Sequence, residues 1–111
     1  MATLTSHTLN GTDGTHAGGI KVTFTNLDSG EIMFDGYMDD GGRLSQNISD
    51  ERIDTQATYE LAFGTKAYWT ARGTNATVTQ IVLRFEMLDP SGLYHMPIIL
   101  SPNSYSMWSS A

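Results

Sequence analysis

Three side chains in this sequence have the types needed to move protons and to bind oxygen atoms: His7, Arg43 and His95. An imidazole titrates at about pH 6.5, so it can accept or release a proton near neutrality. A guanidinium stays protonated and can donate two parallel hydrogen bonds to substrate oxygens. Each residue also has a structural interpretation, because a histidine can lie exposed on a sheet or in the core and a turn arginine can be a solvated charge. These three residues are the candidates for general acid–base chemistry.

Other kinds of site find little support in the sequence. His7, His16 and His95 lack the short pair spacings that zinc ligands favour. The run 39–43 does not fit a calcium loop, because glycine and arginine stand where carboxylates are needed. Since no serine lies in a Gly-x-Ser-x-Gly motif, a covalent acyl-enzyme is not indicated. We expect no metal and no cofactor.

The elements that position these residues are predicted to be β-strands, because apolar residues recur with a period of two. Segments with one apolar face are residues 21–25, 31–37, 58–63 and 77–87. The segment 77–87 is the longest of these and is predicted to be a central strand. In the segment 31–37, Ile32 and Phe34 should share the apolar face. On the first strand, His7 should lie on a mostly polar face, opposite Leu4.

Residues that favour turns separate these segments. Glycine-rich stretches at 11–14, 18–19 and 39–42 tolerate the positive φ angles of tight turns. One short helix is expected at about 65–73, ending at a glycine. Seven to eight short strands with turns about ten residues apart predict an all-β sandwich. We expect a single domain over residues 1–111.

Composition limits the partners and the location. The chain has 111 residues, no cysteine and a formal net charge of -6. An acidic surface repels nucleic acid and anionic lipid, so we expect neither as a partner. No apolar run approaches the roughly 20 residues of a membrane span, and the first residues do not resemble a secretory signal. Without cysteines for disulfides, a cytoplasmic location is predicted.

Several ordered motifs resemble one family. Residues 4–10 read Leu-Thr-Ser-His-Thr-Leu-Asn, and residues 14–19 read Gly-Thr-His-Ala-Gly-Gly. They are similar to the opening of the transthyretin-related family, which runs Leu-Ser-x-His-Val-Leu-Asp and then Gly-x-Pro-Ala-x-Gly, so His16 stands at a proline position. Residues 42–44 resemble its Asp-Gly-Arg-Leu turn, and residues 94–102 match its late strands. The resemblance implies a transthyretin-like (prealbumin-like) sandwich.

The resemblance also implies a function. The family contains 5-hydroxyisourate hydrolases of urate breakdown, which open a ring of a purine-derived substrate with water, and transthyretins, which carry thyroid hormone. The family enzymes use two histidines and an arginine at the positions of His7, Arg43 and His95. This match favours the hydrolase branch, with catalysis by these three residues in a homotetramer built as a dimer of dimers. The sequence leaves open which of the two histidines is the general base.

The last four residues differ from the family pattern. Trp-Ser-Ser-Ala at 108–111 stands where the enzymes have Tyr-Arg-Gly-Ser. By alternation, Ser106, Trp108 and Ser110 share a face. The resemblance implies that this face lines the channel between dimers, so these residues are predicted to bind substrate there, with Trp108 alternatively an interface residue. Loss of the arginine leaves two alternatives open. They are a hydrolase for a bulkier substrate, such as an N-methylated hydroxyisourate, and a non-catalytic binding tetramer.

Overall fold

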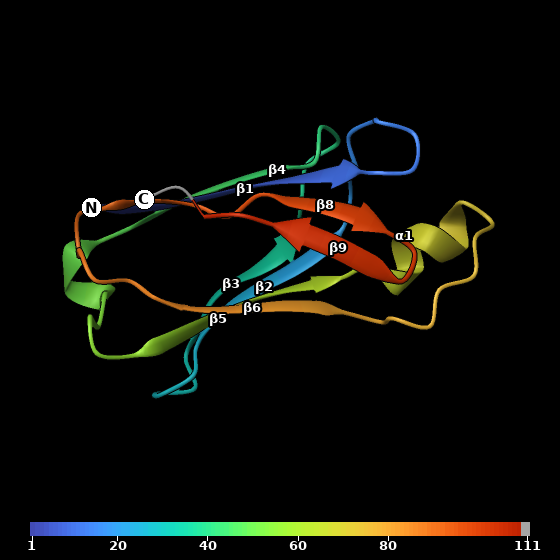
Figure 1. Cartoon of the computed structure of the whole chain (residues 1–111). Helices are drawn as coiled ribbons and strands as arrows, with labels where there is room; N and C mark the ends of the chain where they lie inside the picture. Colours follow the sequence, from blue (N-terminus) through green and yellow to red (C-terminus); the bar gives the residue numbers. More distant parts are fainter. Residues whose placement is uncertain (110–111) are drawn as a thin grey trace.

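Two β-sheets pack face to face in the computed structural model, which describes residues 1–109 (Figure 1). The elements in chain order are β1 (Ala2–Asn10), β2 (Lys21–Asn26), β3 (Ile32–Tyr37), β4 (Arg43–Ile48), η1 (Asp50–Arg52), β5 (Thr58–Gly64), α1 (Lys66–Ala71), β6 (Ile81–Glu86), β7 (Leu93–His95), β8 (Ile98–Ser101) and β9 (Ser104–Met107). The predicted β-sandwich is confirmed. In the described part of the chain there are nine strands rather than seven or eight, because its C-terminal end is divided into three short ones.

The first sheet has the order β4-β1-β8-β9, and β7 also pairs with β1. Both β7 and β8 run parallel to β1, β7 beside Thr3–Thr5 and β8 beside Thr8–Asn10. Pro97 separates them, because proline has no N–H to donate to a ladder. This break makes His95 the last residue of β7.

The second sheet has the order β3-β2-β5-β6. The prediction that residues 77–87 form a central strand is wrong, because β6 covers only Ile81–Glu86 and pairs only with β5 in the described chain. The segment before it is held elsewhere: the Asn103 side-chain oxygen accepts hydrogen bonds from the backbone N–H groups of Thr77 and Val78 at 2.8 and 3.2 Å. The alternation itself is confirmed, since Ile81, Leu83 and Met87 are buried.

A β-bulge corrects another expectation about the second sheet. Phe24 pairs with Phe34, but Thr25 pairs with Ile32, so Met33 is the extra residue. The bulge reverses the alternation, and Ile32 is 58% exposed instead of sharing the partly buried face of Phe34.

The core lies between the sheets, and α1 closes one end of it (Figure 1). Its largest buried side chains include Phe24, Tyr59 and Phe63, with Phe24 and Tyr59 stacked at 5.3 Å between ring centroids. The predicted helix is confirmed in slightly shorter form, ending before Gly73, whose φ is +73°. No helix within residues 1–109 has the length and apolar character needed to cross a bilayer.

Candidate functional site

The three candidate catalytic residues lie on the outer face of the first sheet. In β1 alternate residues are buried, and the half-buried set on the outer face includes Thr5 and His7. Directly paired residues project from the same face of a sheet. His7 pairs with Arg43 of β4, and Thr5 pairs with His95 of β7. Three strands therefore bring His7, Arg43 and His95 together, although 88 positions (95 − 7) separate the two histidines in the sequence.

Thr5 fixes the orientation of His95. Its Oγ1 lies 2.8 Å from Nδ1 of His95 and 3.4 Å from the Tyr94 carbonyl oxygen. If the single hydroxyl proton is donated to that carbonyl, Thr5 accepts the Nδ1–H of His95. Neutral His95 then carries the lone pair on Nε2, as a general base requires. The motifs gave no reason to single out Thr5, because its role depends on the β1–β7 register.

A tight turn delivers Arg43 to this face. Gly42, the preceding residue, has φ +72°, and a Cβ there would lie 2.5 Å from the Thr8 carbonyl oxygen. Only glycine allows this close approach of the turn to β1 without strain. The Asp39 carboxylate accepts a hydrogen bond from the Arg43 backbone N–H at 2.8 Å. The guanidinium itself takes part in none of the hydrogen bonds or ion pairs found among residues 1–109, so it is available to a substrate.

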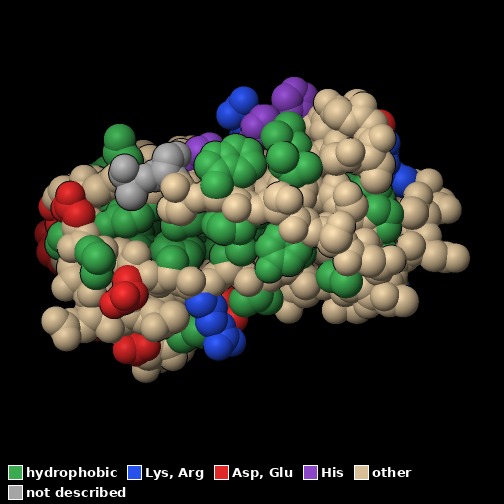
Figure 2. Space-filling view, viewed as in Figure 1, with side chains coloured by type: hydrophobic (Ala, Val, Ile, Leu, Met, Phe, Trp, Pro, Cys, Tyr) green, Lys and Arg blue, Asp and Glu red, His purple; other side chains and the backbone are tan. Residues whose placement is uncertain are grey.

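A cleft of about 420 Å³ opens beside these groups. Its lining comes from β1, β4, β7 and the turn before β4: Thr5, Ser6, Asp39, Arg43, Leu44, Ser45 and His95. Figure 2 shows the histidine side chains gathered at one border of the molecule, close to a cationic side chain. The His95 imidazole and the Arg43 guanidinium line this cleft, where they can exchange protons with a bound molecule and hold its oxygens. His7 lies on the same sheet face but is not part of the lining.

The environment of His7 lowers its pKa below the ordinary value. Partial burial is the largest cause, followed by the positive charge of Arg43, and then by charge on His16 and His95. A hydrogen bond to the Gly41 backbone acts in the opposite direction and favours the protonated ring. A lowered pKa keeps more of the imidazole in the neutral form that can accept a proton at neutral pH.

His16 is a further residue at this site, although the sequence patterns assigned it no role beyond a rejected zinc site and a departure from a family motif. Its Nδ1 lies 2.9 Å from Nε2 of His7. The spacing of His7 and His16 in the sequence does not reveal this contact, because the contact depends on how the loop after β1 folds back beside Leu9. Within residues 1–109, no three His, Cys, Asp or Glu side chains are grouped in a way that could hold a metal ion.

The predicted substrate-binding residues lie farther along the same sheet or outside the described part. Ser106 of β9 pairs with Ile99, which pairs with Leu9 of β1, so Ser106 shares the outer face with His7. Two strand spacings separate it from β1, about 10 Å. Trp108 follows β9 and is 48% exposed. Ser110 lies outside the described residues.

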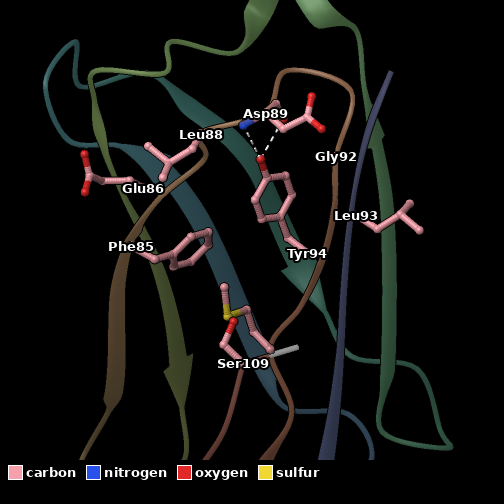
Figure 3. Close-up of a pocket in the computed structure, with 9 residues that line it drawn as sticks. Phe85, Glu86, Leu88, Asp89, Gly92, Leu93, Tyr94 and Ser109 are labelled. Carbon is pink, nitrogen blue, oxygen red and sulfur yellow. Dashed lines mark hydrogen bonds between the residues drawn. The ribbon is translucent and has the colours of Figure 1, made fainter. Parts of the chain in front are cut away.

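A second hollow, of about 410 Å³, lies between the ends of β6 and β7 (Figure 3). Phe85, Leu88 and Met96 contribute apolar surface to it. The Tyr94 hydroxyl points toward the Asp89 backbone, where it accepts the N–H at 2.8 Å and donates to the carbonyl at 2.6 Å. This hydroxyl is fully engaged in holding the turn, and the charged side chains of the lining are the carboxylates of Glu86 and Asp89. Within the described chain, the second hollow therefore lacks the imidazole and the guanidinium that line the cleft beside Arg43 and His95.

Comparison with known proteins identifies the family of this chain. The family model described as "HIUase/Transthyretin family" matches residues 4–109. The 5-hydroxyisourate hydrolase of Pseudomonas aeruginosa is 30% identical over 114 aligned positions, which cover 97% of this chain and 90% of that protein. The enzyme of the same name from Deinococcus radiodurans is 29% identical and is covered to 92%, with 95% of this chain aligned.

Solved structures show the same fold. The transthyretin of Sparus aurata superposes with a TM-score of 0.84 at 26% identity, covering 96% of this chain and 95% of that one. The 5-hydroxyisourate hydrolase of Klebsiella pneumoniae gives a TM-score of 0.84 at 22% identity, with both chains fully covered. The named relatives support the prediction of a hydrolase. With the family model matching nearly the whole sequence, this chain belongs to the HIUase/transthyretin family.

Proposed function

We propose that this protein hydrolyses 5-hydroxyisourate, opening a ring of that purine-derived substrate with water. The observation that carries the proposal is the common outer face on which His7 pairs with Arg43 and Thr5 pairs with His95. The P. aeruginosa and D. radiodurans relatives bear the name of this activity. The protein needs no cofactor for it, because water, two imidazoles and a guanidinium can supply each step.

In the proposed mechanism one imidazole removes a proton from a water molecule while the oxygen of that water attacks the ring carbonyl carbon. The carbon–nitrogen bond then breaks, and the departing nitrogen takes up a proton from the protonated imidazole. The Arg43 guanidinium donates hydrogen bonds to the carbonyl oxygen, where negative charge develops. A positioned general base contributes about 10² to 10⁴ in rate. Of the two imidazoles, His95 is the better candidate for the base, because Thr5 orients its Nδ1 and it lines the cleft.

The proposed substrate contacts beyond the catalytic groups are Ser106, Trp108 and Ser110, which would close the pocket in a homotetramer. The assembly is supported by β9 and β6, which are end strands of their sheets among the described residues. Exposed apolar side chains lie on these edges, including Tyr105 at 47%, Met107 at 37% and Val82 at 36% exposure. Unpaired strand edges of this kind are usually covered in a soluble protein. Light scattering at micromolar concentration tests the assembly, and a strict monomer contradicts it.

A second candidate function follows from the exposed indole of Trp108, at 48% exposure. A flat apolar surface at the proposed pocket favours a bulkier or less polar substrate, such as an N-methylated hydroxyisourate. The cytoplasm is the proposed location for either activity.

The test of the proposed function is the decay of freshly generated 5-hydroxyisourate, followed by ultraviolet absorbance with and without the protein. We expect acceleration by the wild type and its loss in His7→Ala and His95→Ala. Both variants are first checked for a native circular dichroism spectrum. If the folded wild type leaves the decay at the buffer rate, the proposed substrate is wrong, and methylated analogues are then compared in the same assay.

A further inference from the structure

A histidine outside the proposed catalytic set contacts His7 directly. The His16 Nδ1 lies 2.9 Å from the His7 Nε2, which is a hydrogen-bond distance. The two rings are also stacked, with 4.9 Å between centroids and 27° between planes. Because His16 is exposed, its position is not explained by packing in the core.

The backbone holds His16 in this place. His16 forms an isolated bridge with Leu9, which lies on the outer face two residues after His7. The bridge is flanked by hydrogen bonds from Asn10 N–H to the Thr15 carbonyl at 2.8 Å and from Ala17 N–H to the Thr8 carbonyl at 2.9 Å. The diagonal neighbour across two strands is within reach of an aromatic side chain, so this pairing directs His16 toward His7.

The hydrogen bond between the two rings contains one proton, which lies between Nε2 of His7 and Nδ1 of His16. One nitrogen must carry a hydrogen and the other must present a lone pair. When the pair gains one further proton, the imidazolium can still donate to the neutral ring, and the hydrogen bond becomes charge-assisted. When both rings are protonated, two N–H groups face each other and the hydrogen bond is lost. His16 therefore links the protonation of His7 to its orientation.

His7 is surrounded by groups of one sign. Arg43 faces it from β4, His95 from β7 and His16 from the loop after β1, and the Gly41 backbone is hydrogen-bonded to it. Among residues 1–109, no carboxylate contributes to the pKa shift of His7, although Asp39 lies in the same turn as Arg43. A proton on His16 adds to a positive field and opposes a proton on His7.

We propose that His16 is a positioning residue of this site, which holds the His7 ring in one orientation through the Nδ1–Nε2 hydrogen bond. This inference rests on the proposed hydrolase function for its catalytic meaning, but the contact can be tested without activity. His16 supplies no atom to the substrate. It acts by fixing the orientation of the His7 ring and which of its two nitrogens carries the hydrogen.

The experiment compares the wild type with His16→Phe and His16→Asn. Phenylalanine keeps a ring that can stack but has no nitrogen. Asparagine retains an uncharged polar group near the position of Nδ1. Imidazole ¹⁵N spectra recorded across pH give the pKa and tautomer of His7, and the pH dependence of kcat/KM for 5-hydroxyisourate gives the effect on catalysis.

In His16→Phe we expect the ¹⁵N shifts of neutral His7 to move away from those of the wild-type tautomer, because the hydrogen-bond partner of Nε2 is lost. The value of kcat/KM should fall roughly two- to tenfold, the contribution of one neutral hydrogen bond that orients the ring. In His16→Asn the ¹⁵N shifts should stay closer to the wild-type tautomer. Unchanged ¹⁵N shifts of neutral His7 in His16→Phe would overturn the inference. If the wild type lacks ring-opening activity, the proposed function fails, and the spectra still decide the role of His16.

Discussion

Replacing Thr5 with valine should impair catalysis without unfolding the protein, if His95 is the general base. Valine has nearly the shape of threonine but lacks the hydroxyl, which lies 2.8 Å from Nδ1 of His95. Because Thr5 is only half-buried, the change leaves no strongly buried polar group without a partner. A neutral hydrogen bond contributes about 0.5 to 1.5 kcal/mol. If the full contribution serves to orient the ring in the transition state, kcat/KM should fall roughly two- to tenfold.

The assay follows 5-hydroxyisourate by ultraviolet absorbance and compares Thr5→Val with Thr5→Ser, which keeps the hydroxyl and should retain most of the activity. Thr3→Val is the matched control. Thr3 lies on the same strand and face as Thr5, but its hydroxyl donates to the Asn47 side chain at 3.0 Å rather than to a histidine. Urea unfolding of all three variants separates loss of orientation from loss of stability.

The reasoning is refuted if Thr5→Val and Thr3→Val have the same kcat/KM while both are folded. Such a result would mean that the Thr5 hydroxyl does not orient the reacting group, and that His7 is the better candidate for the base. A loss in Thr5→Val that Thr5→Ser does not repair would instead assign the effect to packing beside His95.

Three further expectations concern the turn, the guanidinium and pH. Gly42→Ala should lower the free energy of unfolding by about 3 kcal/mol or more in urea, because φ is +72° and the added Cβ would lie 2.5 Å from the Thr8 carbonyl oxygen. Gly14→Ala, at φ +76° with nothing within 4 Å, should lose only about 1 to 2 kcal/mol, and equal losses would contradict the argument. Arg43→Lys should keep the fold and lower kcat/KM on the order of tenfold, since an ammonium cannot make the forked contact; activity equal to wild type would exclude the clamp. Because folding lowers the pKa of His7, the unfolded chain binds its proton first, so thermal stability should fall as pH drops from about 6.5 toward the folded-state pKa; a His7→Gln variant with the same slope would rule out this source.

The sequence alone determined the class of the molecule, because strand formation and turn chemistry are local properties. Apolar residues that recur with a period of two predicted the strands, and glycines predicted turns such as the one before Arg43. The predicted bounds of the helix near Trp69 are within two residues of the observed ones. The candidate His7, Arg43 and His95 came from local motifs as well. Their common face follows from strand alternation once the strands are paired.

Other features depended on which strands become neighbours, and local patterns do not encode that. Residues 77–87 had the length and apolar face of a central strand, but Asn103 holds the first part of that segment and β6 forms an edge. The sequence pattern placed Ile32 on the apolar face of its strand. Ile32 is exposed instead, because a bulge opposite Thr25 turns its side chain to the other face of the sheet.

The contacts that organise the site were also decided by the tertiary structure. The hydrogen bond between Thr5 and His95 joins residues 90 positions apart, and it exists because the parallel pairing of β1 with β7 places His95 beside Thr5. The contact between His7 and His16 needs the loop to return beside Leu9 in one register. A side chain's type is set by the sequence, but its neighbour is set by backbone pairing, because a shift of one residue would turn it to the other face of the sheet.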